Sequence, residues 1–239
     1  MKILSLDSSA TVASVALFED GRLLAEYTLN NGNTHSETLL PMVESVLKMY
    51  GINVDDVDLF AATTGPGSFT GVRIGAATVK GLAFGTDKPC VEVSTLEAIA
   101  ENLTCVKGLV CPVMNARRSQ VYTALFRSDG KTLTRLMPDS AISIEELDGI
   151  LSSYGEPVYF AGDGYSITLK ELKLTAAEET PERLRHQSAS SVASVAYRQA
   201  TLGNTVTDAE LKVTYLRPSQ AERTRLEKEN SENIREYKA

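Results

Sequence analysis

The most informative stretch of this sequence is the glycine-rich run Gly65-Pro66-Gly67-Ser68-Phe69-Thr70-Gly71-Val72-Arg73-Ile74-Gly75. It follows an apolar segment over residues 59–64 and opens an amphipathic one, which predicts a tight turn from a buried strand into a helix. Glycine at such a turn permits a close backbone approach, or a positive φ, that a Cβ atom would obstruct. The run therefore predicts a strand-to-helix unit of an α/β fold.

The spacing of these glycines does not match the common nucleotide-binding motifs. Gly-x-Gly-x-x-x-Gly is one residue too long for the dinucleotide fingerprint, and no Gly-Lys-Ser/Thr follows as a P-loop requires. A general anion pocket at the start of the helix stays open as an alternative, because free N–H groups and the helix dipole both favour negative charge there.

The helix expected over residues 70–84 carries three interior glycines: Gly71, Gly75 and Gly81. Each costs about 1 kcal/mol relative to alanine, so some other interaction must offset the cost. Two explanations remain open. The glycine face packs closely against the chain's own sheet, or a helix of another chain docks on it.

The chain repeats one order of elements. The first copy predicts strands over 2–6, 12–18, 23–29, 59–64 and 90–93, and helices over 35–50, 70–84 and 94–102. The second predicts strands over 109–114, 121–126, 133–137 and 158–161, with helices over 143–151 and 190–199. Asp20-Gly21 and Asp129-Gly130 give each copy a hairpin turn. A duplicated βββαβα order implies two sheet lobes covered by helices.

Two helix starts have the spacing of a capping box. Thr34 stands three residues before Glu37, and Ser143 three residues before Glu146. The serines Ser68 and Ser94 are also placed to cap the helices that follow them.

Composition limits the classes of function. The 239 residues carry 43% hydrophobic and 23% charged side chains, which is ordinary for a globular protein. A net charge of -7 excludes strong long-range attraction to phosphate backbones, so any RNA would need charge from another chain. No leader or membrane-spanning run is evident, and we expect a cytoplasmic protein. Three cysteines without Cys-x-x-Cys spacing (Cys90, Cys105, Cys111) are expected to be buried, without a disulfide or a zinc ion.

His35 and Ser68 are the residues that invite an enzymatic interpretation. A helical metal motif would place a second histidine three or four residues after His35, where Thr38 and Leu39 stand instead. Ser68 lacks the Gly-x-Ser-x-Gly elbow of a hydrolase nucleophile. His35 is therefore expected to be a histidine beside a helix cap, and Ser68 an N-cap.

Several motifs together resemble the bacterial TsaB family, from Met1 to about Arg217. They are the run 65–75, Thr34-His35-Ser36-Glu37-Thr38-Leu39-Leu40-Pro41, Asn115-Ala116-Arg117-Arg118 with Val121-Tyr122, Gly162-Asp163-Gly164 and Tyr215-Leu216-Arg217-Pro218. The resemblance implies an actin-like (ASKHA, RNase H-like) α/β fold. It also implies a non-catalytic partner and scaffold of TsaD, the ATP-using enzyme that forms threonylcarbamoyl-adenosine beside the anticodon of tRNA.

The same resemblance sets expectations for domains and partners. Residues 1–105 would form the lobe that carries the dimer helices, and 106–217 a second, smaller lobe whose last helix closes it or packs back on the first. Residues 218–239 would be a charged tail. TsaD is expected as the heterodimer partner and the TsaE ATPase in a larger assembly, with a homodimer when the chain is alone. The chain is expected to contact tRNA only through the complex and to bind no membrane.

For the site residues, the resemblance implies neither a catalytic nor a metal-binding residue, since the two-histidine metal motif of the catalytic relative is missing. The expected interface residues are His35, Leu39, Met42, Val43, Val46, Phe69, Val72, Arg73, Gly75 and Ala76, with the apolar side chains of the first helix exposed. No cofactor is expected to be required. A degraded site for at most weak nucleotide binding would comprise Asp7, Ser8, Gly65, Gly67 and Ser68.

Three alternatives remain open at this point. Asp7, at the end of the first strand, belongs to the degraded nucleotide site or simply caps its hairpin. Arg117 and Arg118 either bind a carboxylate or phosphate group of the partner or of RNA, or they form a solvated turn. As a whole, the chain is a scaffold, or an enzyme in its own right of the metallopeptidase or actin-like ATPase and sugar-kinase type.

Overall fold

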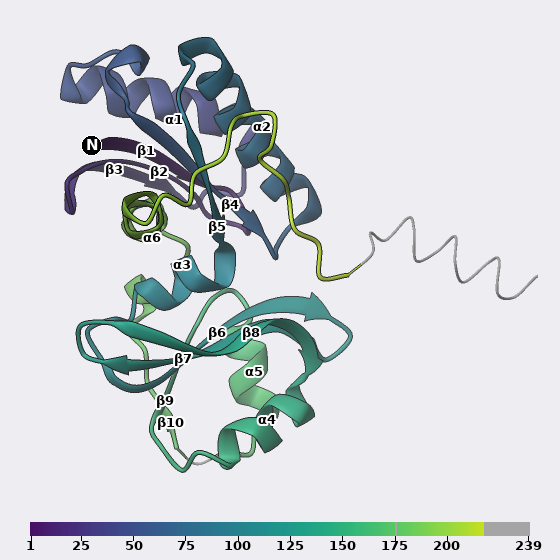
Figure 1. Ribbon diagram of the computed structural model, residues 1–239. Helices are drawn as coiled ribbons and strands as arrows, with labels where there is room; N and C mark the ends of the chain where they lie inside the picture. Colours follow the sequence, from purple (N-terminus) through teal and green to yellow (C-terminus); the bar gives the residue numbers. More distant parts are fainter. Residues whose placement is uncertain (175, 218–239) are drawn as a thin grey trace, which may run out of the picture.

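The computed structural model describes residues 1–174 and 176–217, which form two lobes, each built on its own sheet (Figure 1). The predicted tail over 218–239 lies outside the described residues. No helix within the described ranges combines the length and hydropathy needed to cross a lipid bilayer.

The first lobe has a five-stranded sheet in the order β3-β2-β1-β4-β5. Strand β1 runs antiparallel to β2 and parallel to β4. Its elements are β1 (Lys2–Asp7), β2 (Ala13–Glu19), β3 (Arg22–Leu29), α1 (His35–Tyr50), the short 3-10 helix η1 (Val54–Asp56), β4 (Leu59–Gly65), α2 (Phe69–Thr86) and β5 (Cys90–Ser94).

The second lobe repeats this topology, with its sheet in the order β10-β9-β6-β7-β8. Its elements are β6 (Lys107–Arg117), β7 (Gln120–Asp129), β8 (Leu133–Ser143), α4 (Ile144–Ser152), β9 (Val158–Ala161), α5 (Tyr165–Glu171) and β10 (Ala177–Glu178). Within each lobe, the first strand along the chain lies in the middle of the sheet. The second and third strands follow it on one side, and the fourth and fifth strands on the other. The predicted fold class, actin-like with duplicated βββαβα lobes, is confirmed. Helix α5 and strand β10 are the elements of this lobe that the sequence analysis missed.

Helices cover both faces of the first sheet. Leu4 and Leu6 of β1 face the core beneath α1 and α2, while Ile3 faces the opposite core, beneath α6 (Ala189–Thr201). This alternation follows from the two-residue period of a strand. Helix α6, which follows the 3-10 helix η2 (Glu182–Leu184), thus packs back on the first lobe (Figure 1).

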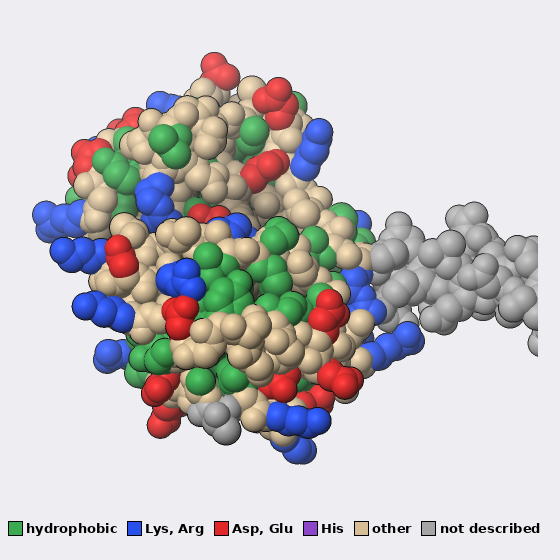
Figure 2. All heavy atoms as spheres, turned by 60° about the horizontal axis from the view of Figure 1, so that its bottom comes forward, with side chains coloured by type: hydrophobic (Ala, Val, Ile, Leu, Met, Phe, Trp, Pro, Cys, Tyr) green, Lys and Arg blue, Asp and Glu red, His purple; other side chains and the backbone are tan. Residues whose placement is uncertain are grey.

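Helix α3 (Thr95–Glu101) lies between the two lobes (Figure 1). Its apolar side chains Leu96 and Ile99 pack into the second lobe's core with Phe126. On the other face of this second sheet, α4 and α5 cover a separate core. Figure 2 shows one face of the molecule, with hydrophobic side chains gathered near its middle and charges of both signs around them.

Most predicted caps are present. Ser68, Ser94 and Ser143 each accept a hydrogen bond from the backbone N–H three residues on, at 3.2, 3.2 and 3.1 Å. The prediction of a capping box at Thr34 is wrong, because the Thr34 side chain makes no cap hydrogen bond. Thr38 Oγ1 instead donates to the Thr34 carbonyl oxygen. The prediction that all three cysteines are buried is also wrong, since Cys105 is exposed.

Candidate functional site

The glycine run forms the turn between β4 and α2 and packs against the turn between β1 and β2. A Cβ atom added at Gly67 would fall 2.5 Å from the Ser9 carbonyl oxygen, and one at Gly71 would overlap the Ser8 carbonyl oxygen. At Gly75 it would lie 2.7 Å from Ser8 Oγ. The packing partner of Gly71 and Gly75 is therefore the chain's own β1–β2 turn, which favours the first explanation for these glycines.

Hydrogen bonds tie the same two turns together. The Ser68 N–H donates to the Ser9 carbonyl oxygen at 2.7 Å, and Ser8 Oγ donates to the Gly71 carbonyl oxygen at 2.9 Å. Ser68 Oγ in turn caps α2 through the Gly71 N–H. Three residues of the predicted nucleotide site, Ser8, Gly67 and Ser68, thus lie together, but they contact Ser9 and Gly71 of the same two turns.

Asp7 is completely buried at the end of β1. Its Oδ1 atom accepts hydrogen bonds from Ser9 N, at 2.8 Å, and from Ser9 Oγ, at 2.6 Å. Oδ2 has no hydrogen-bond partner among the described residues. Burial raises the pKa of Asp7 to about 6, against the opposing effect of the Ser9 donors. In this structure Asp7 caps the β1–β2 hairpin, which favours the capping role over a place in a degraded nucleotide site.

His35 opens α1, and its Nε2 atom lies 2.6 Å from the Ala10 carbonyl oxygen. That contact makes Nε2 a donor and holds the start of α1 against the β1–β2 turn. Within the described ranges, no three His, Cys, Asp or Glu side chains lie together as metal ligands would.

The second lobe has a matching glycine turn. Gly162, with φ of 111°, lies against the backbone of Val113, and Gly164 contacts the same residue. Between them, Asp163 accepts a hydrogen bond from the Asn115 N–H at 3.1 Å, and burial raises the pKa of its carboxyl group. Each lobe therefore packs a glycine turn on the start of its hairpin.

A cleft of about 550 Å³ separates the two turns. Ser9, Gly67 and Phe69 line it from the first lobe, and Asn115, Arg117 and Asp163 from the second. Arg117 starts the β6–β7 turn, where residues 117–119 all have positive φ. The structure thus brings the predicted Gly67 and Ser68 into one cleft with Arg117, while Asp7 and Ser8 lie buried beneath it.

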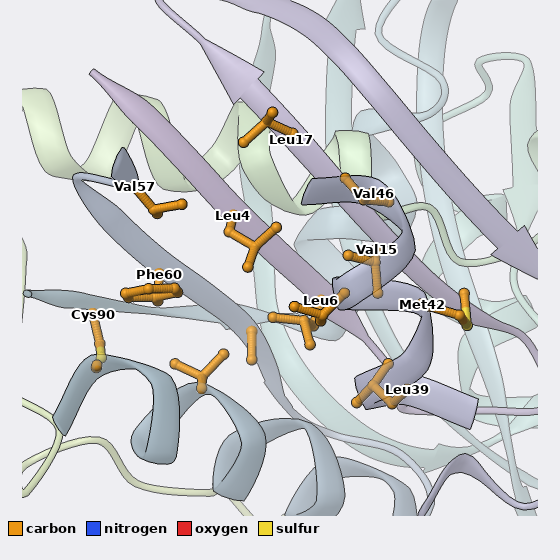
Figure 3. Packing of buried hydrophobic residues seen from close by; sticks show 14 of the residues in the cluster. Leu4, Leu6, Val15, Leu17, Leu39, Met42, Val46, Val57, Phe60 and Cys90 are labelled. Carbon is orange, nitrogen blue, oxygen red and sulfur yellow. The ribbon is translucent and has the colours of Figure 1, made fainter. Parts of the chain in front are cut away.

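Most predicted interface residues are buried. Leu39, Met42, Val43 and Val46 are 1–4% exposed and pack under α1 on Leu6 and Val15 (Figure 3). The prediction that they are exposed is wrong, because the sheet beneath the helix takes up this apolar stripe. Val72, Gly75 and Ala76 of α2 are buried too. Of the predicted set, His35 and Phe69 are half-buried and Arg73 is exposed.

Other apolar side chains on these two helices are exposed, and the sequence analysis missed them. Met49 is 88% exposed and Phe84 is 78% exposed. They lie on the last turns of α1 and α2, and Leu40 and Tyr50 of α1 add further exposed apolar surface. The signal that could have found Phe84 is its place outside the apolar stripe of α2.

Two lobes of the same strand order, joined across a cleft, define an actin-like α/β protein. The family model described as "TsaD: tRNA N6-adenosine threonylcarbamoyltransferase" matches residues 22–221. A relative from Bacillus subtilis (strain 168), named tRNA threonylcarbamoyladenosine biosynthesis protein TsaB, is 35% identical over 70% of this chain and 73% of its own length. The chain belongs to the TsaB family, within the wider group that the TsaD model describes.

Two further similarities agree. The protein of the same name from Escherichia coli (strain K12) is 38% identical over 54% of this chain, a match that spans about half of that relative (56%). The solved structure of YeaZ from Pseudomonas aeruginosa is 28% identical, with a TM-score of 0.76 over 90% of this chain and 99% of that one.

Proposed function

We propose that this chain takes part in forming threonylcarbamoyl-adenosine on tRNA, as a non-catalytic subunit that docks onto TsaD. Membership of the TsaB family supports the biosynthetic role, since the relatives at 35–38% identity are named for it. The assignment as a scaffold and the partnership rest on the geometry described above. TsaE, the tRNA bound through the complex, and a cytoplasmic location are parts of the same proposal.

The β1–β2 turn supports the non-catalytic role. In a phosphate site, backbone N–H groups of such a turn and of the following helix point at the ligand. Here the Ser68, Gly71 and Ser9 N–H groups already donate to Ser9 O, Ser68 Oγ and Asp7 Oδ1. A phosphate would have to displace these internal acceptors. The proposed subunit therefore requires no nucleotide of its own and binds one weakly at most.

The exposed apolar face of α1 and α2 carries the proposed partnership. The two helices contact each other and lead into the parallel neighbours β4 and β5, so both end at the same edge of the sheet. Met49 and Phe84 stand on those last turns. Exposed apolar side chains on paired helices are typical of surfaces that another protein covers. TsaD, which the family model relates to this chain, would offer a similar helix pair, and a second copy of this chain would do so when TsaD is absent.

The test is reconstitution with TsaD and TsaE, with and without this chain, measuring threonylcarbamoyl-adenosine in tRNA and the TsaD affinity. Met49→Glu and Phe84→Glu should each weaken TsaD binding by roughly tenfold or more, because a charge would be buried in an apolar contact. Leu202→Glu is the matched control, since Leu202 is also 78% exposed but lies after α6. Modification that proceeds equally without this chain would overturn the proposal.

A further inference from the structure

The last described residues, 212–217, cross from the first lobe to the second; we call this segment the strap. In Figure 1 it runs down beside α2 towards the lower lobe. Thr214, Tyr215 and Arg217 line the same cleft as the two glycine turns. The strap is therefore one wall of the cleft, contributed by a segment outside both sheets.

The strap is attached to the first lobe by its backbone. The Thr214 N–H donates to the carbonyl oxygen of Thr64, at the end of β4, at 2.8 Å. The Thr214 carbonyl oxygen lies against Gly65, where a Cβ atom would overlap it, and the Lys212 N–H donates to the Glu92 carboxylate. Gly65 thus has a role within the chain, which is to admit the strap.

Side chains fasten the strap to α2. The Tyr215 ring stacks on Phe69 with ring centroids 4.5 Å apart and planes 28° from parallel. The Arg73 guanidinium lies 3.8 Å from the Phe69 centroid, and Arg73 Nε donates to Tyr215 Oη at 2.6 Å. Stacking and a hydrogen bond therefore act on Tyr215 of the strap, and the Arg73 guanidinium, 5.4 Å from the Tyr215 ring centroid, adds a cation–π contact.

On the second lobe, the strap ends in Arg217. Its Nη1 atom donates to the carbonyl oxygen of Ala116 at 2.9 Å. Ala116 is buried near the end of β6, next to the turn over residues 117–119 that faces the cleft. Two residues after the Tyr215 contact, the strap thus holds the hairpin of the opposite lobe.

Away from the cleft, the chain crosses between the lobes in the segment between β10 and α6, where Asn102 donates to the carbonyl oxygens of Leu184 and His186, and at α3. Helix α3 packs on the second lobe's core, and ion pairs of Glu97 with Arg135 of β8 and of Glu101 with Arg198 of α6 join both lobes to it. Connections at α3 and at the neighbouring β10–α6 segment alone leave the lobes free to turn about this side of the molecule. A second connection across the cleft removes that freedom.

We propose that the strap is a latch that sets the width of the interlobe cleft. Seated between Phe69 and Ala116, it holds the two lobes in the arrangement described. Released, it lets the lobes turn about the side of the molecule that carries α3 and opens the cleft. This inference does not depend on the partnership with TsaD, because every contact that carries it lies within the chain.

The experiment measures the distance between the lobes in the full chain. Spin labels are attached to cysteines introduced at Asp55 and Glu145, exposed positions on the first and second lobes, after Cys105→Ser removes the exposed native thiol. The distance distribution is recorded for the parent protein and for Tyr215→Ala with Arg217→Ala. Thr214→Ala is the matched control, because its side chain is exposed and its contacts with the first lobe are made by its backbone.

The double variant is expected to give a longer and broader distance distribution, while Thr214→Ala matches the parent. Hydrogen exchange should also rise by roughly tenfold at the Thr214 amide and in the turn over 117–119. The thermal midpoint checks that each variant is folded. A folded double variant with an unchanged distribution would overturn the latch. So would faster exchange confined to the strap, because the lobes would then be held without it.

Discussion

The Oγ atom of Ser8 donates a hydrogen bond to the carbonyl oxygen of Gly71 across 2.9 Å. This contact joins residues that are 63 positions apart and sets how closely α2 approaches the end of β1. Because Gly71 has no side chain, the Ser8 carbonyl can lie directly against its Cα. Glycine at this position is therefore explained by the fold of the single chain.

Replacing two glycines of α2 separately tests that explanation. Gly71→Ala is expected to lower the free energy of unfolding by about 1–3 kcal/mol, since its Cβ would meet backbone that cannot rotate away. Gly81→Ala is the control, because nothing lies within 4 Å of the added Cβ, and it should stabilise the chain by up to about 1 kcal/mol. Urea unfolding measures both. Equal stability of the two variants would contradict the packing described for Gly71.

Asp7 predicts a pH dependence. Its folded pKa, about 6, lies above its ordinary value, so the folded state holds the proton more tightly. The resulting stability is fully present below about pH 4 and is lost as the pH rises through 6. Asp7→Asn keeps an oxygen for the Ser9 donors but does not titrate. Relative to the parent, it should gain about 1–3 kcal/mol between pH 4 and pH 7.5. Unfolding at both pH values measures this, and a constant difference would argue against a buried, titrating Asp7.

The purified chain alone is expected neither to hydrolyse ATP nor to bind zinc stoichiometrically. The Ser9 and Ser68 N–H groups are engaged within the chain, and His35 Nε2 faces the Ala10 carbonyl oxygen. Phosphate release and metal content by mass spectrometry test this, with TsaD as the positive control. If the chain alone hydrolyses ATP and Asp7→Asn abolishes this activity, the assignment as a non-catalytic subunit is wrong.

Local sequence signals predicted the secondary structure well where a strand or helix has its own period and caps. The hairpin turns, the β4–α2 turn and the caps at Ser68, Ser94 and Ser143 are all local, and the structure contains them. Helix α5 was missed because it has only seven residues and no side-chain cap. What the sequence could not supply was contact between distant residues, such as Arg217 with Ala116.

The candidate site shows the same limit. The sequence singled out Asp7, Gly67 and Ser68, and these do lie together, but only the structure shows that Ser9 hydrogen-bonds to Asp7 Oδ1 and to the Ser68 N–H and packs against Gly67. On α1, helical period predicts which side of the helix is apolar. It does not predict where the elements that cover this side end.

Met42 and Met49 make that limit measurable. They stand seven residues apart on α1, so both point to nearly the same side, yet Met42 is 2% exposed and Met49 is 88% exposed. Met42→Glu would place a carboxylate in the core with Leu39, and it should cost several kcal/mol or prevent folding. Met49→Glu should change the free energy of unfolding by less than about 0.5 kcal/mol.

Circular dichroism and urea unfolding compare the two variants, with Met42→Leu as a volume-conserving control that should cost less than about 1.5 kcal/mol. The same substitution is made twice on one helix, so a difference of several kcal/mol between the two variants reflects burial, which exceeds the effect of a charge near the helix end. If the Met42→Glu protein is folded and has lost only its affinity for TsaD, Met42 lies in the interface, as the sequence analysis predicted. Loss of the fold at Met42, with a folded Met49→Glu protein that binds TsaD weakly, would instead locate the docking surface at the exposed end of the helix.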